Sequence, residues 1–222
     1  MLFGMFKNGY ANLYRHEKEI NDLNVFPVAD GDTGVNMRLT LENGIASTKE
    51  NANVGVLLKG FSNGVLFGAR GNSGVILSQI IKGWAVTLRK CQIIGVGELR
   101  NAMINGYKQA YSAVSHPVEG TVLTVAREGI ENIRGKIGRG TTIEDLFSMY
   151  IKEMRSSLQK TPELLDVLKK ADVVDSGAVG YITIIEGMFK YLFGQTLDIP
   201  DPEAKTQESV VPKTATETRV CA

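Results

Sequence analysis

Apolar side chains recur at three- and four-residue spacing along most of the chain, and no segment shows the strict alternation of a half-buried strand. Phe6, Tyr10 and Leu13 begin one such stripe, and Leu99 and Met103 begin another. Stripes of this kind are typical of helices that pack one face into a core, so we expect an all-α fold with eight or nine helices. The spacing predicts helices over residues 3–22, 33–47, 54–67, 73–88, 99–115, 121–133, 142–158, 162–171 and 179–193.

Cap residues and glycines mark where these helices are separated. Thr142 with Asp145, or Thr141 with Glu144, fits a capping box at the start of the predicted helix 142–158. The glycine-rich segment 135–140 lacks the glycine spacing of a phosphate-binding loop. We therefore expect that segment to be a solvated connection between two helices.

The composition indicates one domain with a substantial core and a short tail. Hydrophobic residues make up 43% of the 222 residues, which is too many for a disordered chain. We assign residues 1–198 to a single domain. Residues 199–222 are rich in Pro, Thr, Glu and Lys and show little periodicity, so we expect a disordered tail there.

Charge, cysteines and hydropathy exclude several classes of protein. A net charge of +1 argues against a nucleic-acid partner. Cys91 and Cys221 form no Cys-x-x-Cys pair, which argues against a zinc site or a disulfide framework and fits a reducing cytosol. No apolar run reaches the ~18 residues of a transmembrane helix, and the first residues do not resemble a secretion signal. We expect a cytoplasmic protein without a transmembrane segment.

The stretch 24–37 carries the most distinctive chemistry of the chain. Asp30 and Asp32 flank Gly31, and either Asp32 or Thr33 stands at the N-cap position of the predicted helix 33–47. Carboxylate oxygens are the ligands that Mg²⁺ prefers, and helix N-termini attract phosphates. One loop therefore offers sites for both the metal and the phosphates of a metal–nucleotide complex.

Simpler explanations of this stretch exist. Asp and Gly are also favoured in ordinary turns and helix caps, and the residues alone leave that alternative open. A calcium-binding EF-hand does not fit. Counted from Asp30, the glycine that an EF-hand requires falls on Val35, and its closing glutamate falls on Leu41.

A second glycine-rich segment, 68–74, joins two predicted helices. Its glycines, with Asn72 and Ser73 between them, could present backbone N–H groups to an anion. A close crossing of two helices would also require small residues, and on the residues alone that is the simpler interpretation. The segment is not a Walker loop, because no Gly-Lys-Ser/Thr closes it. Thr121 and Asp175 precede other predicted helices, where such residues are commonly caps.

Four stretches of the chain resemble, in the same order, the signature motifs of the dihydroxyacetone kinase L-type domain. The similarity is greatest to the N-terminal nucleotide-binding domain of bacterial fatty acid kinases, the partners of DegV-type fatty-acid-binding proteins. It extends from about residue 3 to about residue 193, and four ordered motifs are far more specific than a lone glycine pattern. The four stretches are 24–37, 68–79, 117–126 and 173–177.

The resemblance implies a particular architecture. Proteins of this kind form an antiparallel eight-helix barrel with the nucleotide–Mg²⁺ site at one end. Each of the four motifs lies at the start of a predicted helix. Bundling the helices with those ends together would gather their dipoles around one anionic ligand.

The resemblance also implies cofactors and residue roles. ATP with Mg²⁺, as two ions, would be bound, and the activity would be that of an ATP-dependent kinase. Asp30 and Asp32 would hold the metal and serve phosphoryl transfer, with Asn24 as a third, uncharged metal ligand. The nucleotide-binding residues would be Thr33, Asn36, Gly71, Asn72, Ser73, Gly120, Thr121, Asp175, Ser176 and Gly177.

The chain departs from the family pattern at a few positions. Asn24 and Thr33 stand where the dihydroxyacetone branch has an aspartate and a histidine, which favours the fatty acid kinase branch. Ala29 replaces the proline that is usual in that branch. Ala178 and Val179 replace a usual Gly-Lys, and the missing lysine would weaken phosphate contacts in that loop.

Three functional hypotheses follow from the resemblance. The first is a kinase domain that transfers the γ-phosphoryl group of ATP to a fatty acid carboxylate on a DegV-type carrier, giving acyl phosphate. The second is the L subunit of a dihydroxyacetone-type (glycerone) kinase, working with a separate substrate-binding subunit. The third is a non-catalytic nucleotide-binding regulatory module. We also consider a homodimer.

Overall fold

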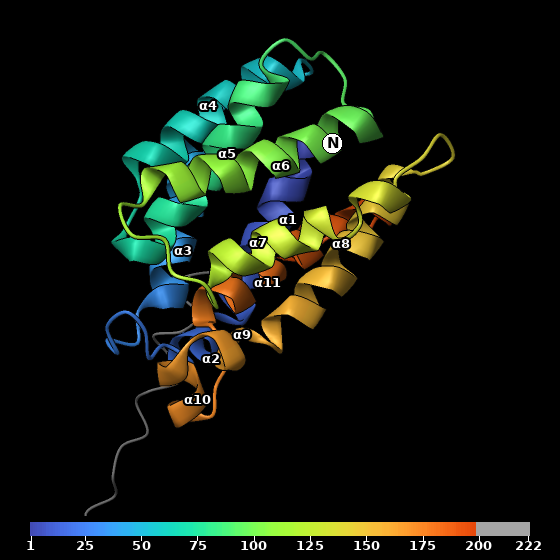
Figure 1. Cartoon of the computed structure of the whole chain (residues 1–222). Coiled ribbons are helices and arrows are strands. Elements are labelled where there is room, and N and C mark those ends of the chain that lie inside the picture. The colour runs from blue at the N-terminus through green and yellow to red at the C-terminus, as the bar shows by residue number, and fades with distance from the viewer. Residues whose placement is uncertain (199–222) are drawn as a thin grey trace, which may run out of the picture.

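A computed structural model describes residues 1–198 of the chain and shows helices joined by loops (Figure 1). Within that part of the chain there are eleven α-helices, one 3₁₀ turn and no strand, so the predicted all-α fold class is confirmed. The predicted tail at 199–222 lies outside the described residues. The elements are α1 (Leu2–Arg15), α2 (Glu17–Asp22), α3 (Thr33–Ala46), α4 (Val54–Phe67), α5 (Gly71–Leu88), α6 (Val96–Ala113), α7 (Val122–Glu131), η1 (Arg134–Lys136), α8 (Ile143–Leu158), α9 (Thr161–Leu164), α10 (Asp166–Ala171) and α11 (Ser176–Leu192).

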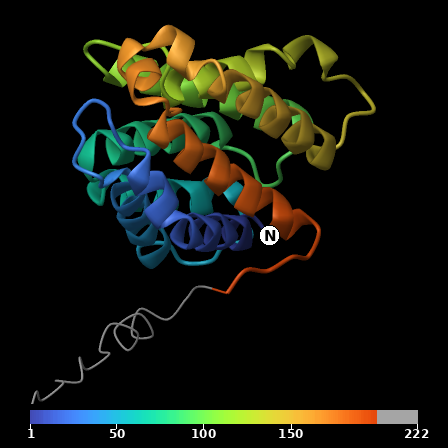
Figure 2. The same ribbon diagram turned by 90° about the horizontal axis from the view of Figure 1, so that it is seen from below.

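The long helices pack against their neighbours in the chain. Figure 1 shows α4, α5 and α6 stacked side by side and α7 beside α8, and these pairs are in contact. In Figure 2, α11 runs between α1 and α8, and it contacts both. Further contacts join α1 to α3 and α3 to α4. Because α3 also contacts α5 and α11, these contacts do not separate a barrel from a filled bundle, and the eight-helix barrel stays a prediction.

The interior between these helices is mainly apolar. Phe6 and Phe61 stack with their ring centroids 4.0 Å apart. Tyr150 and Tyr181 are fully buried and satisfy each other, with their hydroxyl oxygens 3.1 Å apart. None of the described helices is both long and apolar enough to cross a membrane.

Helices α1 and α11 lie so close together that side chains of α1 donate hydrogen bonds to backbone carbonyl groups of α11. Asn8 Nδ2 donates to the carbonyl oxygen of Gly187 at 2.7 Å, and Asn12 Nδ2 donates to that of Thr183 at 2.7 Å. A Cβ atom at Gly187 would lie 2.6 Å from the carbonyl oxygen of Asn8. The small residue and the buried amides together fix the register of α11 against α1, and thereby the position of the N-terminus of α11.

The sequence predicts one helix over 3–22, and this prediction is wrong. The helix breaks at His16, whose φ of −104° and ψ of 7° separate α1 from α2. The carbonyl oxygen of Asn12 faces His16 Nδ1 at 2.8 Å, while the backbone N–H of His16 bonds to Leu13 instead. A side chain thus takes the hydrogen bond that would have continued the helix.

The predicted helix 162–171 is also two helices, α9 and α10, separated by Leu165 with an extended backbone (φ −137°). Gly120 packs against this junction, since a Cβ atom there would lie 2.9 Å from the carbonyl oxygen of Thr161. The predicted helix 121–133 ends at Glu131, and residues 134–136 of the expected connection form a 3₁₀ turn. The other helices agree with the sequence within a few residues, and the capping box of α8 uses Thr142 and Asp145.

We predict that Gly187→Ala destabilises the protein by about 1–3 kcal/mol, because the added methyl group meets backbone atoms that cannot move aside. Gly97→Ala in α6 is the matched control, since a Cβ atom there has no neighbour within 4 Å. That control should leave the free energy of unfolding unchanged or slightly raised. Urea denaturation measures both variants, and equal effects would contradict the close packing of α1 on α11.

Candidate functional site

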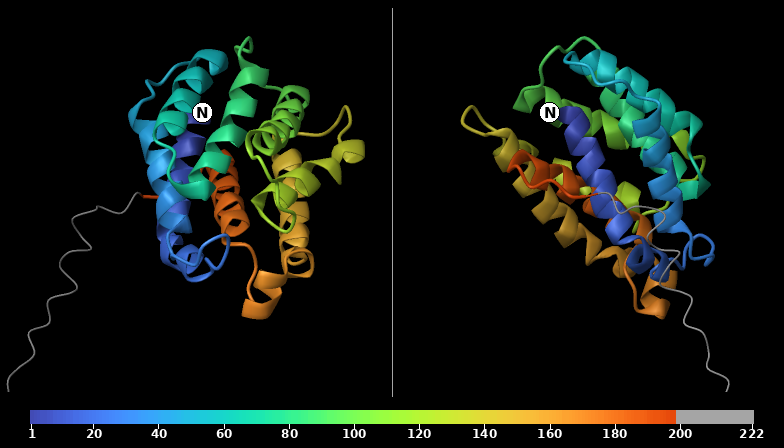
Figure 3. Two further views of the ribbon diagram at one scale, coloured as in Figure 1. Left: turned by 60° about the vertical axis from the view of Figure 1, so that its left-hand side comes forward. Right: turned by 180° about the vertical axis from the view of Figure 1, so that it is seen from behind.

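One end of the molecule collects the N-termini of α3, α5, α7 and α11. Figure 3 shows the loop before α3 and the α9–α10 segment at this same end. A cavity of about 470 Å³ lies there. Every residue that the sequence proposed for the site lines this cavity except Gly120: Asn24, Asp30, Asp32, Thr33, Asn36, Gly71, Asn72, Ser73, Thr121, Asp175, Ser176 and Gly177.

The acidic loop before α3 is closed by the side chain of Asn24. Its Oδ1 accepts a hydrogen bond from the backbone N–H of Asp32 at 3.2 Å, and its Nδ2 donates to the carbonyl oxygen of Val28 at 3.0 Å. Gly31 has a φ of +67°, a conformation that favours glycine. Asn24 is buried, and its hydrogen bonds hold the loop in shape. Its amide oxygen keeps a second lone pair, so its role as a metal ligand stays a prediction.

Of the two N-cap candidates, Asp32 and Thr33, Asp32 occupies the N-cap position of α3, yet its side chain makes no capping hydrogen bond. Asn21 of α2 performs that role, because its Oδ1 accepts from the N–H groups of Gly34 at 2.7 Å and Val35 at 3.3 Å. Among the described residues, neither the carboxylate of Asp32 nor that of the exposed Asp30 has a hydrogen-bond or ion-pair partner. Both carboxylates are thus available to a ligand.

Within residues 1–198, Asp30 and Asp32 are the acidic side chains that this loop offers to a metal ion. No group of three His, Cys, Asp or Glu side chains within residues 1–198 is arranged to hold a metal. Two carboxylates suit Mg²⁺, which is usually bound by one or two of them together with waters and substrate phosphates. The donor set therefore fits a metal that arrives with a phosphorylated ligand.

The glycine-rich segment at the start of α5 serves a close helix crossing and also lines the cavity. Gly71 has a φ of +59°, and a Cβ atom there would clash with the side-chain amide of Asn36 on α3. Thr40 Oγ1 donates to the carbonyl oxygen of Asn36 at 2.7 Å and accepts from the N–H of Arg70 at 3.2 Å. Both interpretations of the segment are therefore compatible, because packing against α3 brings the N-terminus of α5 to the cavity.

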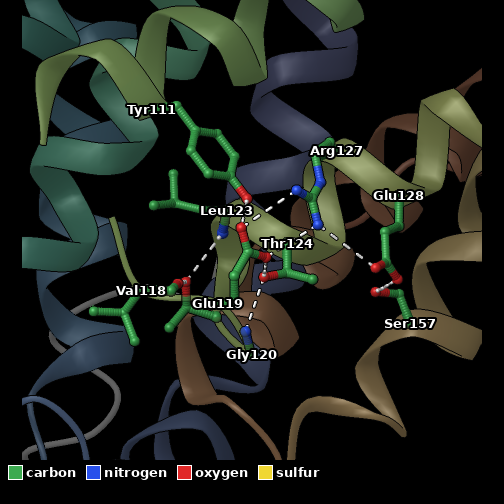
Figure 4. Close-up of polar contacts among 10 residues, drawn as sticks. Tyr111, Val118, Glu119, Gly120, Leu123, Thr124, Arg127, Glu128 and Ser157 are labelled. Carbon is green, nitrogen blue, oxygen red and sulfur yellow. Dashed lines mark hydrogen bonds and ion pairs between the residues drawn. The ribbon is translucent and has the colours of Figure 1, made fainter. Parts of the chain in front are cut away.

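A tight turn precedes α7. Thr121 Oγ1 donates to the carbonyl oxygen of Val118 at 2.8 Å and accepts from the N–H of Leu123 at 3.4 Å (Figure 4). Gly120 has a φ of +79° and is buried against α9 rather than lining the cavity. Its contribution is to the shape of the turn, so direct contact with a cofactor is not supported by its place in the structure.

The N-terminus of α11 is built from two buried polar residues. Asp175 Oδ2 accepts from the N–H of Ala178 at 2.7 Å and caps the helix. Ser176 Oγ donates to Thr33 Oγ1 at 3.2 Å and so joins the start of α11 to the start of α3. Burial raises the pKa of Asp175 from its ordinary 3.8 to about 6, against the opposing effect of hydrogen bonds from Ala178 and Val122.

Part of the cavity is lined by apolar residues that sequence reasoning missed. They come from the acidic loop, from α5 and from the segment that runs from the end of α6 into the start of α7. His116 also lines the cavity. Val75 and Ile76 lie in the second motif, which was the available signal for them. The apolar lining comprises Phe26, Pro27, Val28, Val75, Ile76, Ala113, Val114, Val118, Val122 and Leu123.

Comparison with known proteins places the chain in a family. The DAK2 domain matches residues 27–190, and the chain belongs to the DAK2 domain family. That family, the dihydroxyacetone-kinase L-type domains, is associated with nucleotide binding and kinase function.

Curated relatives come from staphylococci and are longer proteins. An uncharacterized protein of Staphylococcus epidermidis is 40% identical over 208 residues, which is 93% of this chain and 38% of the relative. The uncharacterized protein SSP1546 of Staphylococcus saprophyticus is 40% identical over 209 residues, with the same coverage of 93% and 38%. SAUSA300_1119 of Staphylococcus aureus is 41% identical over 196 residues, 87% of this chain and 36% of the relative. The chain thus spans well under half the length of the relatives it matches.

We predict that Asp175→Asn changes how stability depends on pH. The pKa of Asp175 is raised on folding, so this group favours the folded state fully below pH 4 and progressively less as the pH rises through about 6. The asparagine variant keeps the cap but does not ionise, so its stability relative to wild type should rise by up to about 3 kcal/mol between pH 4 and pH 7.

Asp145→Asn is the control for this measurement. The pKa of Asp145 is lowered, first by its hydrogen bond from the backbone of Thr142, so it stabilises the folded state above its ordinary pKa of 3.8. Its variant should therefore lose stability relative to wild type as the pH rises, the opposite sign. Thermal denaturation in a pH series reports both. The same sign for the two variants would contradict the buried environment of Asp175.

Proposed function

We propose that this chain is an ATP- and Mg²⁺-binding kinase domain that transfers the γ-phosphoryl group to an acceptor held by a partner protein. The observation that carries the proposal is the convergence of four helix N-termini on one cavity that two uncommitted carboxylates also line. Helix N-termini favour phosphate, and paired carboxylates favour Mg²⁺. Few ligands other than a metal–phosphate complex would use both the helix N-termini and the carboxylates.

The charges around the cavity support a metal–nucleotide complex rather than a free anion. Among residues 1–198, those that line the cavity include Asp30, Asp32 and Asp175 and no lysine or arginine. Bare phosphates would be repelled by the acidic loop, whereas phosphates carrying Mg²⁺ would be attracted to it. Asp30 and Asp32 would hold the metal, which supplies neutralisation of charge on the phosphoryl oxygens. The N–H groups at the starts of α3, α5, α7 and α11 that no capping side chain occupies would bind the phosphates.

The apolar side of the cavity suits the base of a nucleotide. Val75 and Ile76 of α5 line the same cavity as the polar helix starts, and so do Val114 and Val118 of the loop between α6 and α7. Nucleotide pockets usually combine an apolar surface for the base with a few placed polar groups for the phosphates. In the transfer itself, an acceptor oxygen would bond to the γ-phosphorus while the bond to the β–γ bridging oxygen breaks and ADP leaves.

The acceptor that we propose is a fatty acid carboxylate on a DegV-type carrier, giving an acyl phosphate. The support is the resemblance in the acidic loop, where Asn24 and Thr33 match the fatty acid kinase branch. The same residues count against the alternative of an L subunit of a dihydroxyacetone-type kinase. The chain covers only 38% of a relative such as that of S. epidermidis, and the remaining length leaves room for parts that engage the carrier.

One observation favours a second candidate, a non-catalytic nucleotide-binding module. Phosphoryl transfer commonly uses a lysine or arginine to stabilise charge, and no such side chain from the described part of the chain lines the cavity. Ala178 and Val179 stand where the resembled family has Gly-Lys, and Ala178 is fully buried. Binding of MgATP without transfer to any acceptor would support this candidate.

We predict that the wild-type protein binds ATP only with Mg²⁺, and that the double variant Asp30→Ala with Asp32→Ala loses this binding by more than about a hundredfold. Changes to residues that only support the ligands of a metal weaken metal binding by about 10–100-fold. Removal of both proposed ligands should therefore weaken binding more. Calorimetric titration with ATP, with and without Mg²⁺, measures the dissociation constants.

Asp22→Ala is the matched control, since Asp22 is exposed on the neighbouring α2 and pairs with Lys18 outside the cavity. It should bind MgATP like the wild type. A folded wild type that binds no MgATP would overturn the proposal, and a double variant that binds as well as the control would remove the acidic loop from the site.

A further inference from the structure

A cluster of charged hydrogen bonds lies behind the turn that precedes α7 (Figure 4). The carboxylate of Glu119 receives two bonds from Arg127 of α7, at 3.0 Å to Oε2 and 3.3 Å to Oε1. Tyr111 of α6 donates to Oε1 at 3.0 Å, and Thr124 Oγ1 of α7 donates to Oε2 at 2.6 Å. None of these four residues lines the cavity. The side chain of Glu119, in the loop between α6 and α7, thus joins these two helices.

The cluster is directly connected to residues that do line the cavity. The N–H of Gly120 donates to Thr124 Oγ1 at 2.8 Å, so the same hydroxyl group links the turn to Glu119. Val118 and Thr121, on either side of Glu119 and Gly120, line the cavity and bond to each other. The shape of the turn and the orientation of Glu119 are therefore coupled.

The guanidinium of Arg127 is held from three sides. Its Nη2 lies 3.7 Å from Glu128 Oε1, and Glu128 in turn accepts from Ser157 Oγ of α8 at 2.7 Å. The guanidinium carbon also lies 5.7 Å from the ring centroid of Tyr111. Burial and the hydrogen bond to Glu119 raise the pKa of Tyr111 to about 12, so its hydroxyl keeps its proton and donates at working pH. Arg127 thus presents a fixed, two-pronged donor to Glu119.

We propose that the Glu119–Arg127 ion pair is a positioning device for the nucleotide site: it holds the turn 118–121 so that Val118 and Thr121 face the bound nucleotide. Neither charged group touches the nucleotide in this assignment, and the effect is transmitted through Gly120 and Thr124. The inference rests on the proposed function, since it names what sets the geometry of that same site.

A positioning effect can be distinguished from a direct charge effect. Removing the negative charge of Glu119 would strengthen binding of an anion through space, and removing the positive charge of Arg127 would weaken it. If the pair acts by holding the turn, both changes weaken binding. The double change should then be no worse than either single change, because the partners act as a unit.

The experiment compares Glu119→Gln, Arg127→Gln, their double variant and Arg127→Lys. Calorimetry with MgATP should show a three- to tenfold weaker affinity for each glutamine variant, about the range expected for residues in one hydrogen-bond network. Arg127→Lys should lie between these and wild type, since lysine keeps the charge without the two-pronged geometry. The control is Arg155→Gln, which breaks the Arg155–Glu186 ion pair (2.6 Å) between α8 and α11 away from the cavity. It should bind like wild type.

Hydrogen exchange of the nucleotide-free protein provides a readout that does not depend on binding. The amides of residues 118–124 should exchange faster in Glu119→Gln and Arg127→Gln than in wild type or Arg155→Gln. Opposite shifts in affinity for the two single variants, or unchanged affinity and exchange in both, would overturn the inference. A wild type that binds no nucleotide would instead defeat the proposed function, and exchange alone would then decide whether the pair holds the turn.

Discussion

Close approach of helix backbones is the constraint on which this site depends. Gly187 lets α11 pack on α1, and Gly71 lets α5 pack on the side chain of Asn36 in α3. Gly180 of α11 packs on Met37 of α3 in the same way. A Cβ atom at Gly187 would meet the backbone of α1, and one at Gly71 or Gly180 would have to displace the side chain of Asn36 or Met37. Each change would disturb the packing that brings the helix starts together. The glycines that resemble a phosphate-binding loop in the sequence therefore act first as packing residues, and the cavity is a consequence of that packing.

The second requirement is that the carboxylates of the acidic loop remain free to bind a ligand. An aspartate before a helix is usually consumed as a cap, and here Asn21, from the preceding helix, caps α3 in place of Asp32. At the start of α11 the opposite arrangement holds, because Asp175 is buried and bonded to its own helix. The two acidic motifs look alike in sequence and differ in the structure. One offers carboxylates to a ligand, whereas the other orders a helix start.

Much of the fold could be predicted from the sequence, because apolar periodicity reflects which face of each helix is buried. The predictions fail at two places: at His16, where a side chain bonds to the backbone of its own helix, and at Leu165, where Gly120 from another segment packs against the chain. The residues proposed for the site came from motifs, and all but Gly120 line the cavity. Ala113, Val114 and His116 lie outside the four motifs, and only the packing of α6 and α7 brings them to the site. The Glu119–Arg127 ion pair depends on side-chain geometry, which the spacing of residues along the sequence does not reveal. The roles of all these residues toward a nucleotide stay proposals.

If the four helix N-termini bind one metal–nucleotide complex, amide NMR during a titration with Mg²⁺ and a non-hydrolysable ATP analogue will detect it. The amide signals of Thr33, Asn72, Thr121 and Ser176 should then shift together, along one binding curve, and only when Mg²⁺ is present. Because these residues come from four separate segments of the chain, a common response would be hard to obtain from any other site. Shifts confined to one of the four, or to residues away from the cavity, would show that the helix N-termini do not share one ligand.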